Sequence, residues 1–250
     1  MAWLRRIGLA IGIVLAAATA IALLSQNGQH ADPAAYFSDA DQRSMAAAML
    51  DGNVERMREL AQQGVDLNAP GKEDMTLVQW EMLRNGRSGF RELLGLGADP
   101  NQLGHGGETP LHTAARYQTV FYLEHLLDNG GDADAPDAIG RSPLFSALRT
   151  QRQHNIDLLL DRGADLDHAD RNGMTPLLLA AAVRDFGNVL LLLRHGADPL
   201  QRDRLGGDFQ DMLFKPLDRS LLHGAAERDI DAIINLLEEK NIPVKMEPAR

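Results

Sequence analysis

The chain has 250 residues, with 25 Lys and Arg against 35 Asp and Glu, no cysteine and a formal net charge of −10. Such an acidic chain is poorly suited to nucleic acid or anionic lipid as its main partner, because both carry negative charge. The absence of cysteine excludes disulfides and thiol catalysis, so the core alone must stabilise the fold.

The N-terminal segment has the order of an export signal. Arg5 and Arg6 precede an uncharged run from Ile7 to Leu24, and polar residues follow. Small residues near the end of the run suit cleavage of a signal peptide. The run also reaches the lower limit of a membrane span, so an uncleaved anchor is the alternative.

We therefore expect residues 1–24 to be a signal peptide or an N-terminal membrane anchor, followed by a linker over 25–37. Positive charge before the apolar run orients the rest of the chain outside the cytoplasm, which in a bacterium is the periplasm. Residues 1–30 contain two of the 25 basic side chains and no acid, so the remainder carries 23 basic and 35 acidic side chains, a net charge of −12. Contact with a membrane is expected only through residues 7–24.

Next along the chain, an internal repeat is visible in two independent features. One is a glycine that ends each unit, and the other is a Thr-Pro-Leu or Ser-Pro-Leu motif. The glycines are Gly64, Gly97, Gly130, Gly163 and Gly196, and the motifs begin at Thr109, Ser142 and Thr175. Both features recur at one constant interval, and a fixed period of about 33 residues indicates a solenoid of stacked units.

Each unit predicts two helices. The hydroxyl of Thr or Ser caps a first helix, and the following proline suits its first position. The second helix has an apolar stripe, as at Leu123, Leu126 and Leu127, and the glycine ends it in a left-handed conformation. A polar turn segment such as Asp134–Gly140 then leads to the next pair. One pair cannot bury its own apolar face, whereas stacked pairs can.

These motifs resemble the ankyrin repeat, and the fullest match to its helix start is Gly107–Ala115. The resemblance implies an all-α repeat solenoid of about six helix-turn-helix units joined by β-turn or hairpin loops. It covers residues 38–244, followed by a tail over 245–250. The units are expected near 38–68, 69–101, 102–134, 135–167, 168–200 and 201–244.

The last unit departs from the pattern. We expect its first helix to start at Ser220-Leu221-Leu222-His223, later than the period requires, which leaves an insertion before it. This apolar insertion, Arg204 to Asp218, is interpreted either as a lid over the last core or as a binding loop, since insertions in repeat proteins gather on one face.

Candidate catalytic and metal sites have a simpler structural explanation. His112 occupies the histidine of the ankyrin pattern, where the resemblance implies a hydrogen-bonding role between turns. The sets His105, Glu108 and His112 or His168 and Asp170 lack the two histidines at helical i, i+4 spacing of a metal motif. No nucleophile elbow, phosphate loop or dinucleotide fingerprint occurs. We expect neither an enzyme nor a metal, and no cofactor.

The resemblance implies a protein-binding module that uses its turn tips and the exposed face of its first helices. Arginines in the middle units, with a tyrosine beside them, are typical of binding hot spots. The candidate residues are Lys72, Glu73, Met75, His105, Glu108, Arg116, Tyr117, Ile139, Arg141, Arg149, Arg171, Met174, Phe209 and Phe214.

Two functions remain open for such a module. Exported bacterial proteins that resemble this family occur as immunity proteins, including beside secreted phospholipases. We therefore expect one that binds and inhibits a toxic effector enzyme, possible targets being phospholipases or lipases of a bacterial secretion system, by covering its active site. The alternative is a periplasmic scaffold or chaperone that supports an endogenous envelope enzyme.

Overall fold

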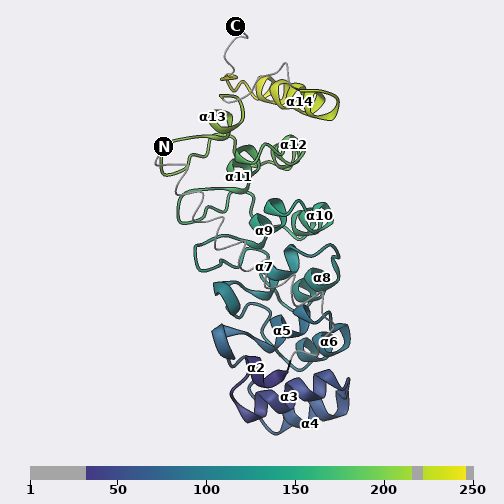
Figure 1. Ribbon diagram of the computed structural model, residues 1–250. Helices are drawn as coiled ribbons and strands as arrows, with labels where there is room; N and C mark the ends of the chain where they lie inside the picture. The colour runs from purple at the N-terminus through teal and green to yellow at the C-terminus, as the bar shows by residue number, and fades with distance from the viewer. Residues whose placement is uncertain (1–31, 216–221, 246–250) are drawn as a thin grey trace. The chain divides into compact units, whose positions relative to one another are not determined.

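The computed structural model describes residues 32–215 and 222–245 (Figure 1). The expected signal segment 1–24 and the tail beyond Lys245 lie outside these residues. The described residues form helices and turns without a strand, which confirms the all-α class. The chain divides into two compact units, Met1–Gly106 and Gly107–Arg250.

The first unit contains a short helix followed by two pairs of helices. The short helix is α2 (Pro33–Tyr36), the first pair is α3 (Ala40–Leu50) with α4 (Val54–Gln62), and the second is α5 (Leu77–Leu83) with α6 (Arg87–Gly95). Polar side chains cap α2, α3, α4 and α5: Asp32 accepts from Ala34 N at 2.9 Å, Asp39 from Gln42 N at 2.9 Å, Asn53 from Arg56 N at 3.0 Å and Thr76 from Gln79 N at 3.1 Å.

The beginning of this unit differs from the sequence-based expectation. Residues 25–37 were expected to be a linker, but helix α2 lies within that range and Phe37 is fully buried. The Phe37 ring packs edge-on against Trp80, with 5.7 Å between centroids. Aromatic burial of this kind stabilises strongly, so the packed domain begins near Pro33.

The second unit continues the helix pairs of the repeat. They are α7 (Pro110–Ala115) with α8 (Phe121–Asp128), α9 (Pro143–Arg149) with α10 (Gln153–Asp161) and α11 (Pro176–Ala182) with α12 (Phe186–Arg194). In Figure 1, the first helices α9 and α11 lie in one row and α10 and α12 in another. Small residues such as Ala114, Ala147 and Ala180 are fully buried, which lets the first helices approach closely.

The last pair is α13 (Phe209–Leu213) with α14 (Ala225–Glu239), and it corrects the expected sixth unit. Its first helix starts after Asp208, whose side chain accepts from Asp211 N at 3.1 Å. The interval from Thr175 to Asp208 equals the interval from Ser142 to Thr175, so the period continues unbroken. The extra residues fall between α13 and α14 instead of before the first helix.

Helix α13 packs against α11 and buries the aromatic residues around it, so this segment covers the preceding core. Residues 216–221, including the expected helix start at Ser220 and Leu221, lie outside the described part of the chain. Ala225 and Ala226 belong to α14, which continues to Glu239 as one helix. A long helix with a single apolar stripe can form the end of a stack, because its outer face meets solvent.

Candidate protein-binding surface

The histidine of the third repeat is part of the framework. His112 is fully buried, its Nδ1 lies 2.8 Å from Thr109 Oγ1 and its Nε2 lies 2.8 Å from the carbonyl oxygen of Arg141. A carbonyl only accepts, so Nε2 carries the proton and Nδ1 accepts from Thr109. Burial lowers the pKa of His112, which favours this neutral form. The predicted structural role is confirmed: the ring links a helix start to the next turn.

Each turn in the second unit is built around one aspartate. Asp137 Oδ1 accepts from the backbone N–H groups of Ile139 and Arg141, both at 2.9 Å. Asp170 and Asp203 make the equivalent pairs of bonds at the same position of the next two repeats. These aspartates are therefore structural, because their oxygens satisfy turn amides.

Three of the predicted arginines lie in one charged cluster in the second unit. Arg116 pairs with Glu108 at 2.6 Å, and Arg141 pairs with Asp137 at 2.7 Å. Arg149, at the end of α9, is exposed and has no ion pair with any residue in the described ranges. Partial burial, and next the charges of Arg141 and Arg116, lower the pKa of Arg149.

The three arginines differ in whether their guanidinium groups are free to bind a partner. The guanidinium groups of Arg116 and Arg141 are held by carboxylates, so a new partner would first have to compete with those carboxylates. Arg149 is repelled by Arg116 and Arg141 and attracted by their partners Glu108 and Asp137, but it has no ion pair of its own among the described residues, so it can bind an incoming carboxylate without displacing another. An unpaired arginine beside two paired ones is thus the strongest anion-binding feature of this cluster.

Tyr117 lies beside this cluster, and most of its contacts are within the fold. Its ring packs edge-on against Tyr122, with 5.4 Å between centroids, and burial raises the pKa of Tyr117 to about 12. Asn155 donates to the carbonyl oxygens of Ala114, Ala115 and Tyr117 and so anchors the end of α7. Tyr117 is half-buried, and with Asn155 it lines a hollow of about 190 Å³.

The other predicted residues of the second unit lie on turns or in the core. Ile139 is 44% exposed, Arg171 is exposed and Met174 is half-buried, so all three reach solvent. Phe209 and Phe214 were expected on a binding surface, but Phe209 is fully buried and Phe214 is 3% exposed. The two rings fill the core beneath α13, which corrects that expectation.

The predicted residues of the first unit form a turn of their own. Lys72 and Glu73 are exposed, and Lys72 donates to the carbonyl of Ala34 at 2.8 Å. The Nδ1 atom of His105 lies 3.1 Å from the carbonyl oxygen of Glu73. Met75 was expected at the surface but is only 4% exposed, so it belongs to the core.

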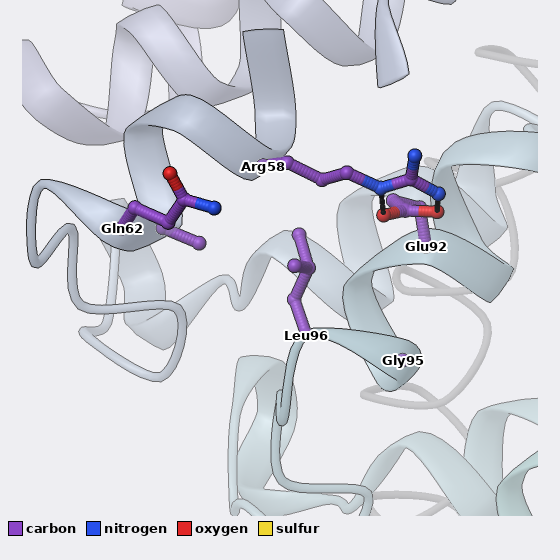
Figure 2. A pocket seen from close by; sticks show the side chains of 6 residues that line it. Arg58, Gln62, Glu92, Gly95 and Leu96 are labelled. Carbon is purple, nitrogen blue, oxygen red and sulfur yellow. Dashed lines mark hydrogen bonds and ion pairs between the residues drawn. The ribbon is translucent and has the colours of Figure 1, made fainter. Parts of the chain in front are cut away.

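A separate hollow of about 560 Å³ lies between the second helices α4 and α6 of the first unit. Figure 2 shows Arg58 and Glu92 meeting at one side of it, with Arg58 Nε and Nη2 at 2.7 and 3.2 Å from the carboxylate oxygens. Gln62, Gly95 and Leu96 line the rest. The ion pair is exposed at Arg58, so it contributes little to stability.

Further chemistry is sparse in the described part of the chain. No group of three His, Asp or Glu side chains within residues 32–215 and 222–245 is placed to hold a metal ion. No helix in these ranges is both long and apolar enough to cross a bilayer.

Sequence reasoning missed two features. One is Glu81, which is 2% exposed and pairs with Arg84 at 2.7 Å. It stands one repeat before Ala114, so a comparison of repeat positions could have identified a charged residue where four of the other units have alanine. The other is the repeat register of Arg204 and Leu205, which were assigned to an insertion but lie at the turn-tip positions of Arg171 and Asn172 one repeat later.

Comparison with known proteins agrees with this architecture. The family described as ankyrin repeats (3 copies) matches residues 79–170 and 123–203, which together span half of the chain. The chain belongs to the ankyrin repeat family.

Two curated relatives and two solved structures place this ankyrin repeat protein further. Protein PhlB of Serratia liquefaciens is 35% identical over 125 residues, 50% of this chain and 54% of the relative. Palmitoyltransferase Hip14 of Drosophila melanogaster is 41% identical over 68 residues, 26% of this chain and 10% of that protein. The chain thus matches about half of the first relative and a tenth of the second.

Among solved structures, the ankyrin repeat domain of Bcl-3, described as a unique member of the IkappaB protein family, superposes with a TM-score of 0.66 at 25% identity. The match covers 84% of this chain and 90% of that one. The ankyrin repeat protein EF0377 gives a TM-score of 0.61 at 21% identity, covering 78% and 96%, and supports the fold alone. Ankyrin repeats mediate protein–protein binding, and this chain is such a module.

Proposed function

We propose that this ankyrin repeat protein binds and inhibits a toxic effector enzyme in the bacterial periplasm, as an immunity protein. The observation that carries the proposal is Arg149, an exposed cation without an ion pair in the described part of the chain, beside two arginines that are already paired. Its unmatched charge suits a carboxylate on the surface of a partner protein.

The N-terminal segment and the bacterial relative support the periplasmic location, and the turn residues support a non-catalytic role. The order of charge and apolar residues in 1–24 supports export, and the relative from Serratia liquefaciens supports a bacterial context. The histidine and aspartates that could have suggested catalysis serve the turns. A binding surface on a stable repeat framework then inhibits by covering the active site or the substrate entrance of its target.

The test uses the full chain with a C-terminal tag, expressed in the organism that encodes it. Proteins that remain bound after washing are identified, and each enzyme among them is assayed alone and with increasing amounts of the ankyrin protein. A lytic enzyme whose activity falls to zero at a stoichiometric ratio supports the proposal. An enzyme whose activity or lifetime is preserved in the complex supports the alternative role as a periplasmic scaffold or chaperone.

Two charge reversals then test whether Arg149 takes part. Arg149→Glu is expected to weaken inhibition at least tenfold, because it removes an interfacial charge and adds a repulsive one. Arg194→Glu is the matched control: Arg194 is also exposed, and it lies at the end of the second helix α12, away from the turn and first-helix positions. Equal inhibition by both variants would exclude the Arg149 cluster from the interface.

A further inference from the structure

The tips of successive turns in the second unit are joined directly by backbone hydrogen bonds. Arg171 N donates to the carbonyl of Ile139 at 3.1 Å, and Arg204 N donates to the carbonyl of Asn172 at 2.9 Å. These bonds place three turns edge to edge. We call the five residues Ile139, Arg171, Asn172, Arg204 and Leu205 the tip ridge.

The backbone of the tip ridge is held in place before any partner binds. Within each of its turns, the aspartate accepts two backbone N–H groups, and a further bond closes the turn, as from Asp203 N to the carbonyl of Gly207 at 2.9 Å. A surface that is already ordered loses little conformational entropy on binding. The ridge is therefore suited to recognition.

The aspartates of these turns have hydrogen-bond partners, whereas two of the neighbouring arginines have no ion pair among the described residues. The Oδ1 atoms of Asp170 and Asp203 accept from turn amides, with bonds of 2.7 to 3.0 Å. Arg171 and Arg204 are both exposed, and neither has an ion pair within residues 32–215 and 222–245. Arg202, close by in sequence, differs because it pairs with Asp208 at 3.4 Å. The ridge thus presents two available guanidinium groups in an otherwise acidic chain.

Two aliphatic side chains on the ridge are exposed beside these cations. Ile139 is 44% exposed and Leu205 is 84% exposed, the largest value among the exposed large hydrophobic residues. An aliphatic side chain this open to water has an unfavourable hydration free energy that contact with a partner would remove. Apolar contacts at both ends with arginines between them define the chemistry of the partner.

We propose that the tip ridge binds an acidic segment of a protein partner in which aliphatic side chains alternate with carboxylates. Arginine binds carboxylates through two parallel hydrogen bonds, and the aliphatic residues would contact Ile139 and Leu205. This inference rests on the proposed function, because it names the chemistry of the bound protein. It adds Arg204 and Leu205 to the interface and separates the tip ridge from Arg116 and Arg141, whose charges are already paired.

An anionic membrane is a poorer match for the same ridge. Electrostatic binding to acidic lipid requires clusters of about 4–8 basic residues, whereas the ridge holds two arginines. The small number of arginines on the ridge therefore favours an acidic protein segment over a membrane.

A defined peptide tests the chemistry without knowledge of the natural partner. The probe is a fluorescent synthetic peptide of alternating glutamate and leucine, added to the full-length protein and followed by fluorescence anisotropy. We expect saturable binding that weakens as salt is raised. A peptide of alternating lysine and leucine should not bind. Equal binding of both peptides, or stronger binding to vesicles of phosphatidylglycerol, would overturn the proposal.

Matched variants then locate the binding. The double variant Arg171→Glu and Arg204→Glu should weaken peptide affinity at least tenfold, and Leu205→Ser should weaken it at least threefold. Arg194→Glu with Arg228→Glu changes the net charge equally at exposed helix positions and should leave affinity within twofold. Circular dichroism and thermal unfolding verify that each variant is folded. Equal loss in both double variants would show a non-specific charge effect and refute the ridge.

The outcome for the ridge can be separated from the outcome for the proposed function. If an inhibited enzyme is captured and the variant Arg171→Glu, Arg204→Glu still inhibits it fully, the ridge is not the interface and the immunity role stands. If the peptide binds at the ridge but captured enzymes stay active, the ridge chemistry stands and the immunity role fails.

Discussion

Glu81 makes stability depend on pH in a direction that can be worked out from its surroundings. The side chain is 2% exposed and its carboxylate pairs with Arg84 at 2.7 Å. Gly86 and Gly89 leave space for it: a Cβ at these positions would lie 1.9 and 2.4 Å from Glu81 Oε1. Burial raises the pKa of Glu81 to about 7, although the charge of Arg84 opposes this shift.

The sign of the effect follows from the two protonation equilibria. Below the unfolded pKa of 4.5 the group is protonated in both states. Between that value and the folded pKa of about 7, the unfolded chain releases the proton while the folded chain keeps it, so stability falls as pH rises. Above pH 7 both states are ionised and no further loss occurs. At about 1.4 kcal/mol per pKa unit, the raised value corresponds to a loss of about 3 kcal/mol.

We therefore expect Glu81→Gln to be more stable than the wild type at pH 8, by about 1 to 3 kcal/mol after allowance for the lost pair with Arg84. At pH 4 the two proteins should differ much less. Urea unfolding followed by circular dichroism at both pH values measures the difference. Glu59→Gln is the control, because the Glu59 carboxylate is exposed and pairs at the surface with Arg56. A difference between Glu81→Gln and the wild type that is the same at both pH values would refute the reasoning.

Three further outcomes test the framework. His112→Ala should lower the free energy of unfolding in urea by about 2 to 3 kcal/mol, because the carbonyl oxygen of Arg141, bound at 2.8 Å, is left without its donor. Burial lowers the pKa of His112, so the wild type should become less stable as pH falls below the unfolded value of 6.5. The variant lacks the imidazole and should not show this pH dependence. Gly89→Ala should lower the unfolding temperature through its contact with the Glu81 carboxylate and should cost little when Glu81→Ala is present, so an equal loss in both backgrounds would be contrary to the structure. Removal of the residues after Ile242 should lower the free energy of unfolding by about 1 to 2 kcal/mol, because Gln210 bonds to the backbone of Pro243 and Lys245 at 3.1 and 2.9 Å. Thermal or urea unfolding measures this loss, and an unchanged midpoint would mean that the segment does not support α13.

The repeat period and the local signals within it were sufficient to predict the fold class and most of the framework. Thr109, His112 and the glycine register are local or periodic features, so their meaning can be read without knowledge of distant contacts. The prediction of the first helix failed at the sixth unit, because that unit lacks the Thr-Pro-Leu motif. Asp208 caps a helix as well as threonine does, and the period pointed to it, but the later Ser220-Leu221-Leu222-His223 resembled the motif more closely.

Exposure and pairing were decided by the tertiary structure. Met75, Phe209 and Phe214 lie beside turns in sequence, yet they pack into the core, because whether a side chain near a turn is covered depends on the neighbouring repeat. The distinction between the paired Arg116 and Arg141 and the unpaired Arg149 has the same origin. Repeats determine where a residue stands in its unit, and burial, ion pairs and the pKa of Glu81 arise from atoms that approach only when the helices pack.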